Sequence, residues 1–91
     1  MRGGNIAVDS KTGIFYTSGG KVGDNGLLFK YGTAIQNFYD EYYTTIDLYT
    51  NSPPYIQDLF DKGQFQGICV ENNIFYQLFW KNSKVIAAFD V

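Results

Sequence analysis

The Gly-rich loop from Ser18 to Gly26 holds the residues best suited to bind an anion. Successive backbone N–H groups of such a loop can surround a phosphate, and a lysine adds positive charge. Gly19, Gly20 and Lys21 would form that site. A Walker-type phosphate loop needs G-x-x-x-x-G-K-[ST] between a strand and a helix, whereas Lys21 directly follows two glycines and a strand is expected next. We therefore interpret the loop as a flexible connection between antiparallel strands, with an anion or nucleotide site as the alternative.

Two pairs of carboxylates and one thiol are the other groups that could do chemistry. Asp40 and Asp47 lie two helical turns apart, and Asp58 and Asp61 lie three residues apart. Paired carboxylates can hydrolyse glycosides or hold Mg²⁺, but both uses need a cleft, so solvated helix faces are expected instead. No cation lies near Cys69 in the sequence to activate its thiol, and we interpret it as a small buried hydrophobic residue.

The composition of the 91-residue chain excludes several classes of active site. With no histidine and one cysteine, it cannot form an internal disulfide, an ordinary zinc or haem site, or a histidine-based catalytic centre. We therefore expect no enzyme activity, no metal site and no cofactor. No apolar run reaches the roughly 18 residues of a membrane span, and no signal peptide is apparent, so we expect no membrane association and a cytoplasmic location.

The distribution of charge is more informative than the net charge of −2. Residues 31–61 contain five acidic residues and no basic one, whereas the flanking zones are weakly basic. An acidic layer that also carries an exposed tyrosine can attract and hold a basic protein surface. The residues expected to bind such a partner are Asp40, Tyr43, Asp47, Asp58 and Asp61. The few cations are scattered, so direct nucleic-acid binding is not expected.

The first third of the chain has the pattern of β-structure. The apolar runs Ile6–Val8 and Ile14–Thr17 flank a turn that starts with Asp9 and ends with Gly13, which predicts a hairpin. This segment, NIAVDSKTGIFYTS, is similar to one hairpin of an NHL-type β-propeller blade, which implies a local antiparallel pair; one blade cannot close a propeller. A third strand is expected over residues 27–31.

The middle third has the pattern of two helices. Apolar residues recur at a helical spacing between Ile35 and Tyr49, which predicts a first helix that starts near Thr33 and ends before Asn51. Ser52 and Pro53 would begin a second helix, and Gly63 would end it. The buried side of this second helix is expected to hold Tyr55, Ile56, Leu59 and Phe60.

The last third has the pattern of a three-stranded meander, over about 64–71, 74–81 and 84–91. Asn72–Asn73 and Asn82–Ser83 are candidates for two-residue turns. The second turn would pair Leu78 with Ala87, and we expect helices to pack on the face that carries Tyr76, Leu78, Trp80 and Phe89. The opposite face is also apolar, so either the N-terminal hairpin covers it or a second copy does. Its self-association residues would be Ile68, Phe75, Phe79 and Ile86.

These patterns predict one α+β domain over residues 1–91, with the element order βββ-αα-βββ, antiparallel sheets and two helices on one face. We expect a non-catalytic protein-interaction module that places its acidic layer on a basic surface of a nucleic-acid-acting protein. In size, acidity and lack of catalytic residues the chain is similar to small acidic inhibitors of phages and mobile elements, such as anti-restriction and anti-CRISPR proteins. The alternatives are a self-associating assembly protein, a homodimer in the simplest case, and a small anion-binding module.

Overall fold

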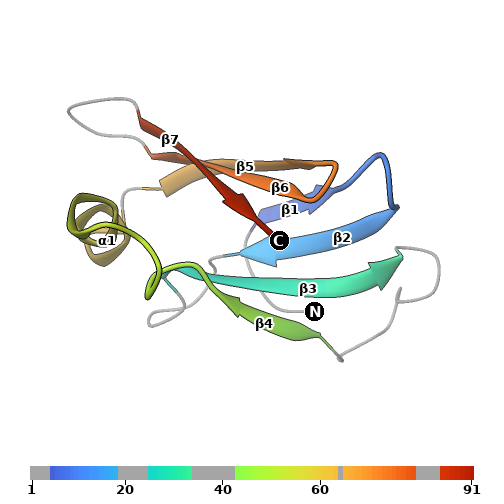
Figure 1. Cartoon of the computed structure of the whole chain (residues 1–91), viewed down its shortest axis with the longest axis horizontal. Coiled ribbons are helices and arrows are strands. Elements are labelled where there is room, and N and C mark those ends of the chain that lie inside the picture. The colour runs from blue at the N-terminus through green and yellow to red at the C-terminus, as the bar shows by residue number, and fades with distance from the viewer. Residues whose placement is uncertain (1–4, 19–24, 34–42, 64, 80–84) are drawn as a thin grey trace.

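Seven strands in two antiparallel sheets and a single helix make up the part of the chain that the computed structural model describes, residues 5–18, 25–33, 43–63, 65–79 and 85–91. One sheet has the order β1-β2-β3-β4 and the other β5-β6-β7. They stack face to face, with β1 beside β5 (Figure 1). The predicted α+β mixture of antiparallel strands and helix is therefore confirmed in outline for a small compact domain, but the described elements follow the order ββββ-α-βββ.

The predicted N-terminal hairpin is confirmed. β1 (Asn5–Val8) pairs with β2 (Ile14–Ser18), and Gly13 adopts a φ of 76° at the end of the turn, a conformation that favours glycine. The carboxylate of Asp9 is fully enclosed. It accepts backbone N–H bonds from Lys11 in its own turn and from Asn72 and Asn73 in the β5–β6 turn, at 2.8–3.1 Å. Asp9 thus fastens the two sheets together at one end.

The predicted first helix is wrong where the structure describes it. β3 (Leu27–Thr33) extends through the expected helix start at Thr33, and residues 44–47 form strand β4 (Thr44–Asp47), which pairs with β3. Thr44, Thr45 and Ile46 are β-branched, and such residues fit a strand better than a helix. Residues 34–42 lie outside the described part of the chain. The single helix described is α1, in place of the two expected.

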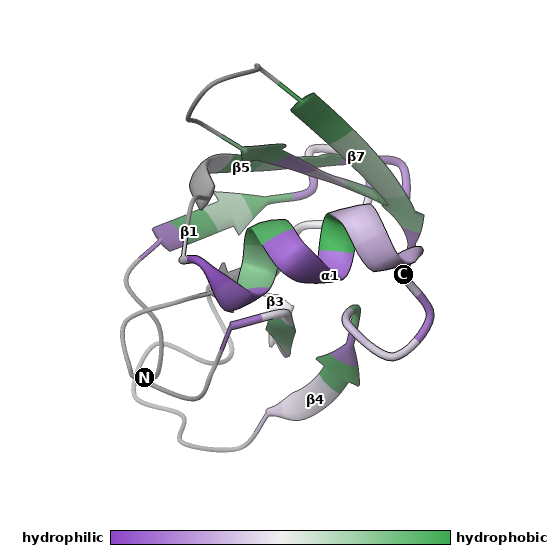
Figure 2. Ribbon diagram, turned by 90° about the vertical axis from the view of Figure 1, so that its left-hand side faces the viewer, coloured by the Kyte–Doolittle hydropathy of each residue, from purple (hydrophilic) through white to green (hydrophobic). Residues whose placement is uncertain are grey.

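Helix α1 (Pro54–Asp61) corresponds to the predicted second helix, displaced by one residue at its start. Pro53 is the N-cap, and the Ser52 hydroxyl donates to the carbonyl of Leu48 at 2.6 Å instead of capping the helix. The expected stop at Gly63 is confirmed, since its φ is 64° and its N–H donates to the carbonyl of Phe60. α1 lies across one end of the sandwich, between β7 and β4 (Figure 2).

The C-terminal meander is confirmed, with one register error. β5 (Phe65–Glu71) and β6 (Ile74–Phe79) are joined by Asn72 and Asn73, both at positive φ, as a two-residue turn requires. β7 (Val85–Asp90) pairs Leu78 with Ile86, not with Ala87. This one-residue slip places each side chain of β7 on the face of the sheet opposite to the one expected. Helices had been predicted to cover the side of the sheet that carries Tyr76 and Leu78, but α1 lies at one end of the sandwich and does not cover it; Trp80 lies outside the described residues.

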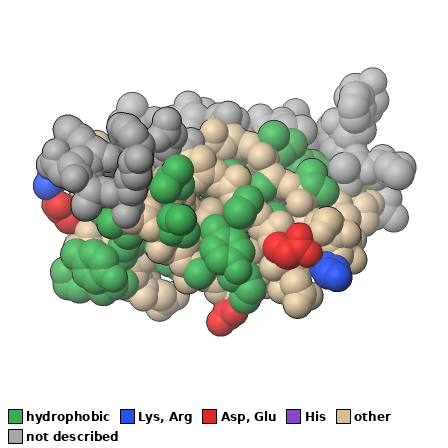
Figure 3. Space-filling model, turned by 90° about the horizontal axis from the view of Figure 1, so that it is seen from above, with side chains coloured by type: hydrophobic (Ala, Val, Ile, Leu, Met, Phe, Trp, Pro, Cys, Tyr) green, Lys and Arg blue, Asp and Glu red, His purple; other side chains and the backbone are tan. Residues whose placement is uncertain are grey.

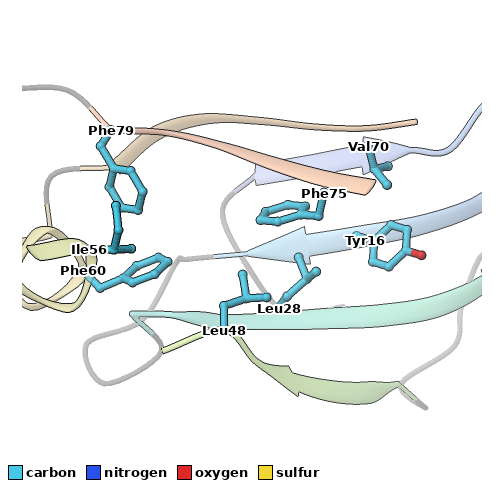
Figure 4. Close-up of a cluster of buried hydrophobic side chains, with 8 residues drawn as sticks. All are labelled: Tyr16, Leu28, Leu48, Ile56, Phe60, Val70, Phe75 and Phe79. Atoms are coloured by element: carbon cyan, nitrogen blue, oxygen red, sulfur yellow. The ribbon is translucent and has the colours of Figure 1, made fainter. Parts of the chain in front are cut away.

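The core lies between the sheets, where the other face of the meander meets β2 and β3 (Figure 4). Phe75 and Phe79 are fully buried there, and Phe60 of α1 contacts Phe79 edge-to-face at 4.9 Å between ring centroids. The eight residues of the cluster are Tyr16, Leu28, Leu48, Ile56, Phe60, Val70, Phe75 and Phe79. The first sheet therefore covers the face that was expected either to meet the N-terminal hairpin or to bind a second copy.

Tyr16 carries a buried hydroxyl that has no hydrogen-bonding partner among the residues that the structure describes. Burial raises the pKa of this group, and the negative charge of Asp9 raises it further. Because a buried donor without a partner loses its bonds to water and gains none, Tyr16→Phe is expected to raise the free energy of unfolding by about 1 kcal/mol. Urea denaturation at pH 7 measures this change. Tyr49→Phe is the control, since the Tyr49 hydroxyl donates to Asp61 and its removal is not expected to stabilise. A loss of stability in Tyr16→Phe would contradict the prediction.

Candidate protein-binding surface

A hollow of about 360 Å³ lies between α1 and the last strand, and we refer to it as the α1–β7 groove. One wall is the turn before α1 and its first residues, and the other wall is β7. The residues that line it are Asn51, Ser52, Pro53, Tyr55, Ile56, Val85, Ile86, Ala87, Ala88 and Phe89. Val85, Ala87 and Phe89 pack toward the core, whereas Ile86 and Ala88 are exposed. Because residues of both faces of β7 line the groove, it follows the edge of this strand.

The helix-side wall is held in place by a dense set of hydrogen bonds. The backbone N–H of Ser52 and the side-chain amide of Gln57 both donate to the carbonyl of Tyr49, at 3.0 and 2.9 Å. Tyr49 in turn packs closely on Gly26: a Cβ at that position would lie 2.7 Å from the Cβ of Tyr49. With the Ser52–Leu48 bond described above, these contacts fix the turn from which α1 starts. The groove therefore has a rigid wall built before any partner binds.

Two large apolar side chains stand exposed on the opposite walls of the groove. Tyr55 on α1 is 67% exposed and Ile86 on β7 is 69% exposed. The expectation that Tyr55 belongs to the buried side of the helix is wrong, whereas Ile56 and Phe60 are buried as predicted. Tyrosine is enriched at protein interfaces, and here an exposed tyrosine and an exposed isoleucine share one groove.

The outer face of the β5–β6–β7 sheet continues this apolar surface. Cys69 and Ala88 lie opposite Tyr76 on the neighbouring strands, and Ile86 lies opposite Leu78. Figure 3 shows hydrophobic side chains gathered over this side of the molecule and acidic ones toward its margins. Cys69 is exposed, which corrects the expectation that it is buried. Ile74, Tyr76 and Leu78 are half-buried, so the most accessible part of the face is at β7.

No protein-family model, no curated protein and no solved structure matches this chain. Function is therefore inferred from the surface itself.

The five residues expected to bind a basic partner do not form one continuous ridge. Tyr43 packs in a separate aromatic cluster, 5.1 Å from Phe29 and 5.6 Å from Tyr31 between ring centroids, and Asp40 lies outside the described residues. The aromatic group next to the carboxylates of α1 is Tyr55, one helical turn before Asp58. The spacing of Tyr55 and Asp58 in the sequence is a signal that could have identified this pair, since residues three apart share a face of a helix.

The remaining acidic residues are near α1, and each has an intramolecular role. Asp58 pairs with Lys62 at 2.7 Å on the exposed side of the helix. Asp61 accepts a hydrogen bond from the Tyr49 hydroxyl at 3.1 Å, and this bond raises the pKa of Tyr49. Asp47 accepts bonds from the Thr50 hydroxyl and from the N–H groups of Thr50 and Tyr49, which hold its pKa below the ordinary value. Asp47 is therefore a turn-forming residue as well as a source of negative charge.

The four residues expected to form a self-association face are divided by the structure. Phe75 and Phe79 are fully buried, and Ile68 packs against the same core cluster. They are not available to a second copy, because the first sheet covers the face on which they lie. Ile86 is the one member that is exposed, and it belongs to the groove. Self-association through this residue stays a prediction.

The other groups considered from the sequence add nothing to the described part of this surface. Gly19, Gly20 and Lys21, the possible anion loop, lie outside the described residues. Among residues 5–18, 25–33, 43–63, 65–79 and 85–91, no cluster of three acidic, cysteine or histidine side chains is placed to hold a metal ion. No helix in those ranges has the length and apolar character needed to cross a membrane.

Proposed function

We propose that this chain is a non-catalytic protein-interaction module that binds a basic partner at the α1–β7 groove. The observation that carries the proposal is the pair of exposed side chains, Tyr55 and Ile86, on facing walls of a preformed groove. Large aromatic and aliphatic side chains of this kind provide most of the binding energy when a partner covers them. A preformed wall also lowers the entropy lost on binding.

The charge around the groove favours a basic partner. No residue that lines it is charged. Among the described residues, those nearest in sequence to the lining residues that carry a charge are Asp47, Asp58 and Asp90; Lys84, which precedes Val85 in the sequence, lies outside the described residues. Asp58 is partly neutralised by Lys62, whereas Asp90 is exposed at the end of β7. Carboxylates at the rim increase the association rate with a positively charged surface and disfavour acidic competitors.

We further propose that the partner is a protein whose basic surface acts on nucleic acid, and that the module inhibits or accompanies it, in the manner of small acidic proteins of phages and mobile elements. The support for this finer step is the acidity and size of the chain. A cytoplasmic setting is part of the same proposal, since an exposed, unpaired cysteine such as Cys69 suits a reducing compartment.

A pair of matched double variants tests the proposed surface. The first is Tyr55→Ser with Asp58→Asn, which removes one exposed apolar side chain and one carboxylate at the groove. The control is Ile6→Ser with Glu71→Gln, which likewise removes one exposed apolar side chain and one carboxylate, but on β1 and β5. Each chain is immobilised, exposed to lysate of the native host and eluted with salt, and the bound proteins are identified by mass spectrometry.

At least one basic protein should bind the wild type and the control equally well. The same protein should bind the groove variant at least about tenfold more weakly. Identification of that protein as one that acts on nucleic acid would support the finer proposal. Equal recovery of every bound protein by the two variants would overturn the proposed surface. Asp47 and Tyr43 are left unchanged, because their substitution would disturb the turn and the aromatic cluster.

A further inference from the structure

The free edge of β7 is the groove feature that best indicates how a partner would bind. β7 is the last strand of its sheet, and only β6 pairs with it. The N–H of Val91 donates to the carbonyl of Asn73 at 2.9 Å. Since alternate residues of an antiparallel strand direct their backbone groups to opposite sides, those of Phe89, Ala87 and Val85 face β6. The N–H and C=O groups of Ile86 and Ala88 therefore face the groove.

These edge groups have no hydrogen-bonding partner in the described part of the chain. The bonds that fix the opposite wall, at Ser52, Gln57 and Leu48, all remain within that wall and do not reach β7. A row of unpaired N–H and C=O groups on an apolar strand is a template for one more strand. Natural edges are often blocked by proline, by inward charges or by a covering segment, and the five residues Val85–Phe89 contain neither proline nor charge.

We infer that the groove takes up an extended, basic segment of the partner protein as an eighth strand, hydrogen-bonded to Ile86 and Ala88 of β7. This inference rests on the proposed function and specifies how the same surface recognises its ligand. Alternate side chains of the added strand would point into the groove, between Tyr55 and Ile86, and the others would point to solvent. The carboxylates of Asp58 and Asp90 would lie at the rim to pair with lysine or arginine side chains.

The shape of the groove favours a single added strand over a second copy of this chain. The turn Asn51–Pro53 forms a wall close to β7, so the space is that of one extended segment. Two copies paired through β7 would bring two such walls and two copies of Asp58 and Asp90 together, and like charges oppose that approach. A basic, extended peptide brings neither a second wall nor further carboxylates to the groove.

A defined peptide probes the inference without knowledge of the natural partner. The probe is a blocked eight-residue peptide in which lysine and valine alternate. Two matched peptides accompany it: one with glutamate in place of lysine, and one with every backbone nitrogen N-methylated, which keeps the charge and side chains but removes the donors of a strand. Binding is measured by isothermal calorimetry, and amide hydrogen exchange of the ¹⁵N-labelled protein is followed by NMR.

The lysine peptide should bind, and it should slow exchange at the amides of Ile86 and Ala88 by about tenfold or more at saturation. The N-methylated peptide should bind at least about tenfold more weakly. Ala88→Pro removes one edge donor at a position where an edge strand tolerates proline and should weaken binding of the lysine peptide to a similar extent. Ala88→Val, which keeps the donor, should bind as the wild type does. If Ala88→Pro does not fold, the N-methylated peptide and the exchange data decide alone.

The outcomes separate the two proposals. Equal binding of the lysine and N-methylated peptides, without protection of Ile86 and Ala88, overturns strand addition while a basic partner remains supported. Equal binding of the lysine and glutamate peptides, or no binding of either, overturns the basic partner. A dimer of the free wild-type protein in sedimentation experiments that becomes monomeric in Ala88→Pro would identify the occupant as a second copy and overturn the inference.

Discussion

Replacement of Phe75 by alanine is expected to destabilise the fold by about 3–5 kcal/mol, the usual cost of removing a buried phenylalanine. Phe75 is fully buried between the sheets and lies 6.2 Å from Phe89 of the neighbouring strand between ring centroids. Domains of this size have a total stability of about 5–15 kcal/mol, so a substantial fraction of the variant would be unfolded in mild denaturant. Urea denaturation followed by circular dichroism measures the difference.

The matched control for Phe75→Ala is Ile86→Ala, which shortens an apolar side chain on the opposite face of the same sheet. Because Ile86 is 69% exposed, its truncation should change the free energy of unfolding by less than about 0.5 kcal/mol. The ratio of the two effects reports which face of the meander is the core. A loss for Ile86→Ala comparable to that for Phe75→Ala would contradict the observed register and favour the one expected from a two-residue turn at Asn82–Ser83, which places Ile86 on the same face as Phe75.

Asp9→Asn is expected to have the second-largest effect on stability. The carboxylate accepts three backbone N–H bonds. In asparagine one of the two oxygens is replaced by an NH₂ group, which would face a backbone N–H and could not accept its hydrogen bond. The melting temperature should fall by roughly 10 °C at pH 7. Thermal unfolding followed by circular dichroism measures this shift. Asp90→Asn, at an exposed carboxylate, is the control and should leave the melting temperature nearly unchanged.

The pH dependence of the same variant gives a second readout. The N–H of Asn73 contributes most to holding the pKa of Asp9 below its ordinary value, and Lys11 and Asn72 add to the effect against the opposing effect of burial. A carboxyl with a lowered pKa stabilises the fold above the pKa of the unfolded chain, and the stability is lost as the pH falls through the folded value. Wild type should therefore lose stability below about pH 4, and Asp9→Asn should lose less. Asp47 also has a lowered pKa, so some acid sensitivity should persist. Parallel melting curves of the two proteins from pH 7 to pH 3 would contradict this account of Asp9.

Local patterns predicted the elements that local chemistry controls. The turns at Asp9–Gly13 and Asn72–Asn73 need particular residues, and both form as expected. The segment around Ile46 was misassigned because apolar residues four apart, such as Tyr42 and Ile46, fit one face of a helix and also one face of a strand. The β-branched run Thr44–Ile46, together with the free edge of β3, decides in favour of a strand.

The register of β7 and the groove between α1 and β7 could not be predicted from local sequence patterns. The observed pairing of Leu78 with Ile86 does not fit a two-residue turn at Asn82–Ser83, and a change of one residue decides which side chains of β7 face the core. The sequence left open whether the N-terminal hairpin or a second copy covers Phe75 and Phe79, because both faces of the meander are apolar. The acidic character of the α1 region was apparent from the sequence. The groove was not, because its walls come from segments about thirty residues apart that only the folded chain brings together.

The hydrogen bonds from Asn72 and Asn73 to the Asp9 carboxylate also bear on the order in which the chain folds. Both turns that they join are local and can form early, but Asp9 and Asn72 are 63 residues apart, and a contact of that separation closes a long loop. We therefore expect these hydrogen bonds to form after the two hairpins, late on the folding pathway. Interactions that form late govern the rate of unfolding more than the rate of folding. We therefore expect the carboxylate of Asp9 to slow the unfolding of the sandwich more than it speeds its folding.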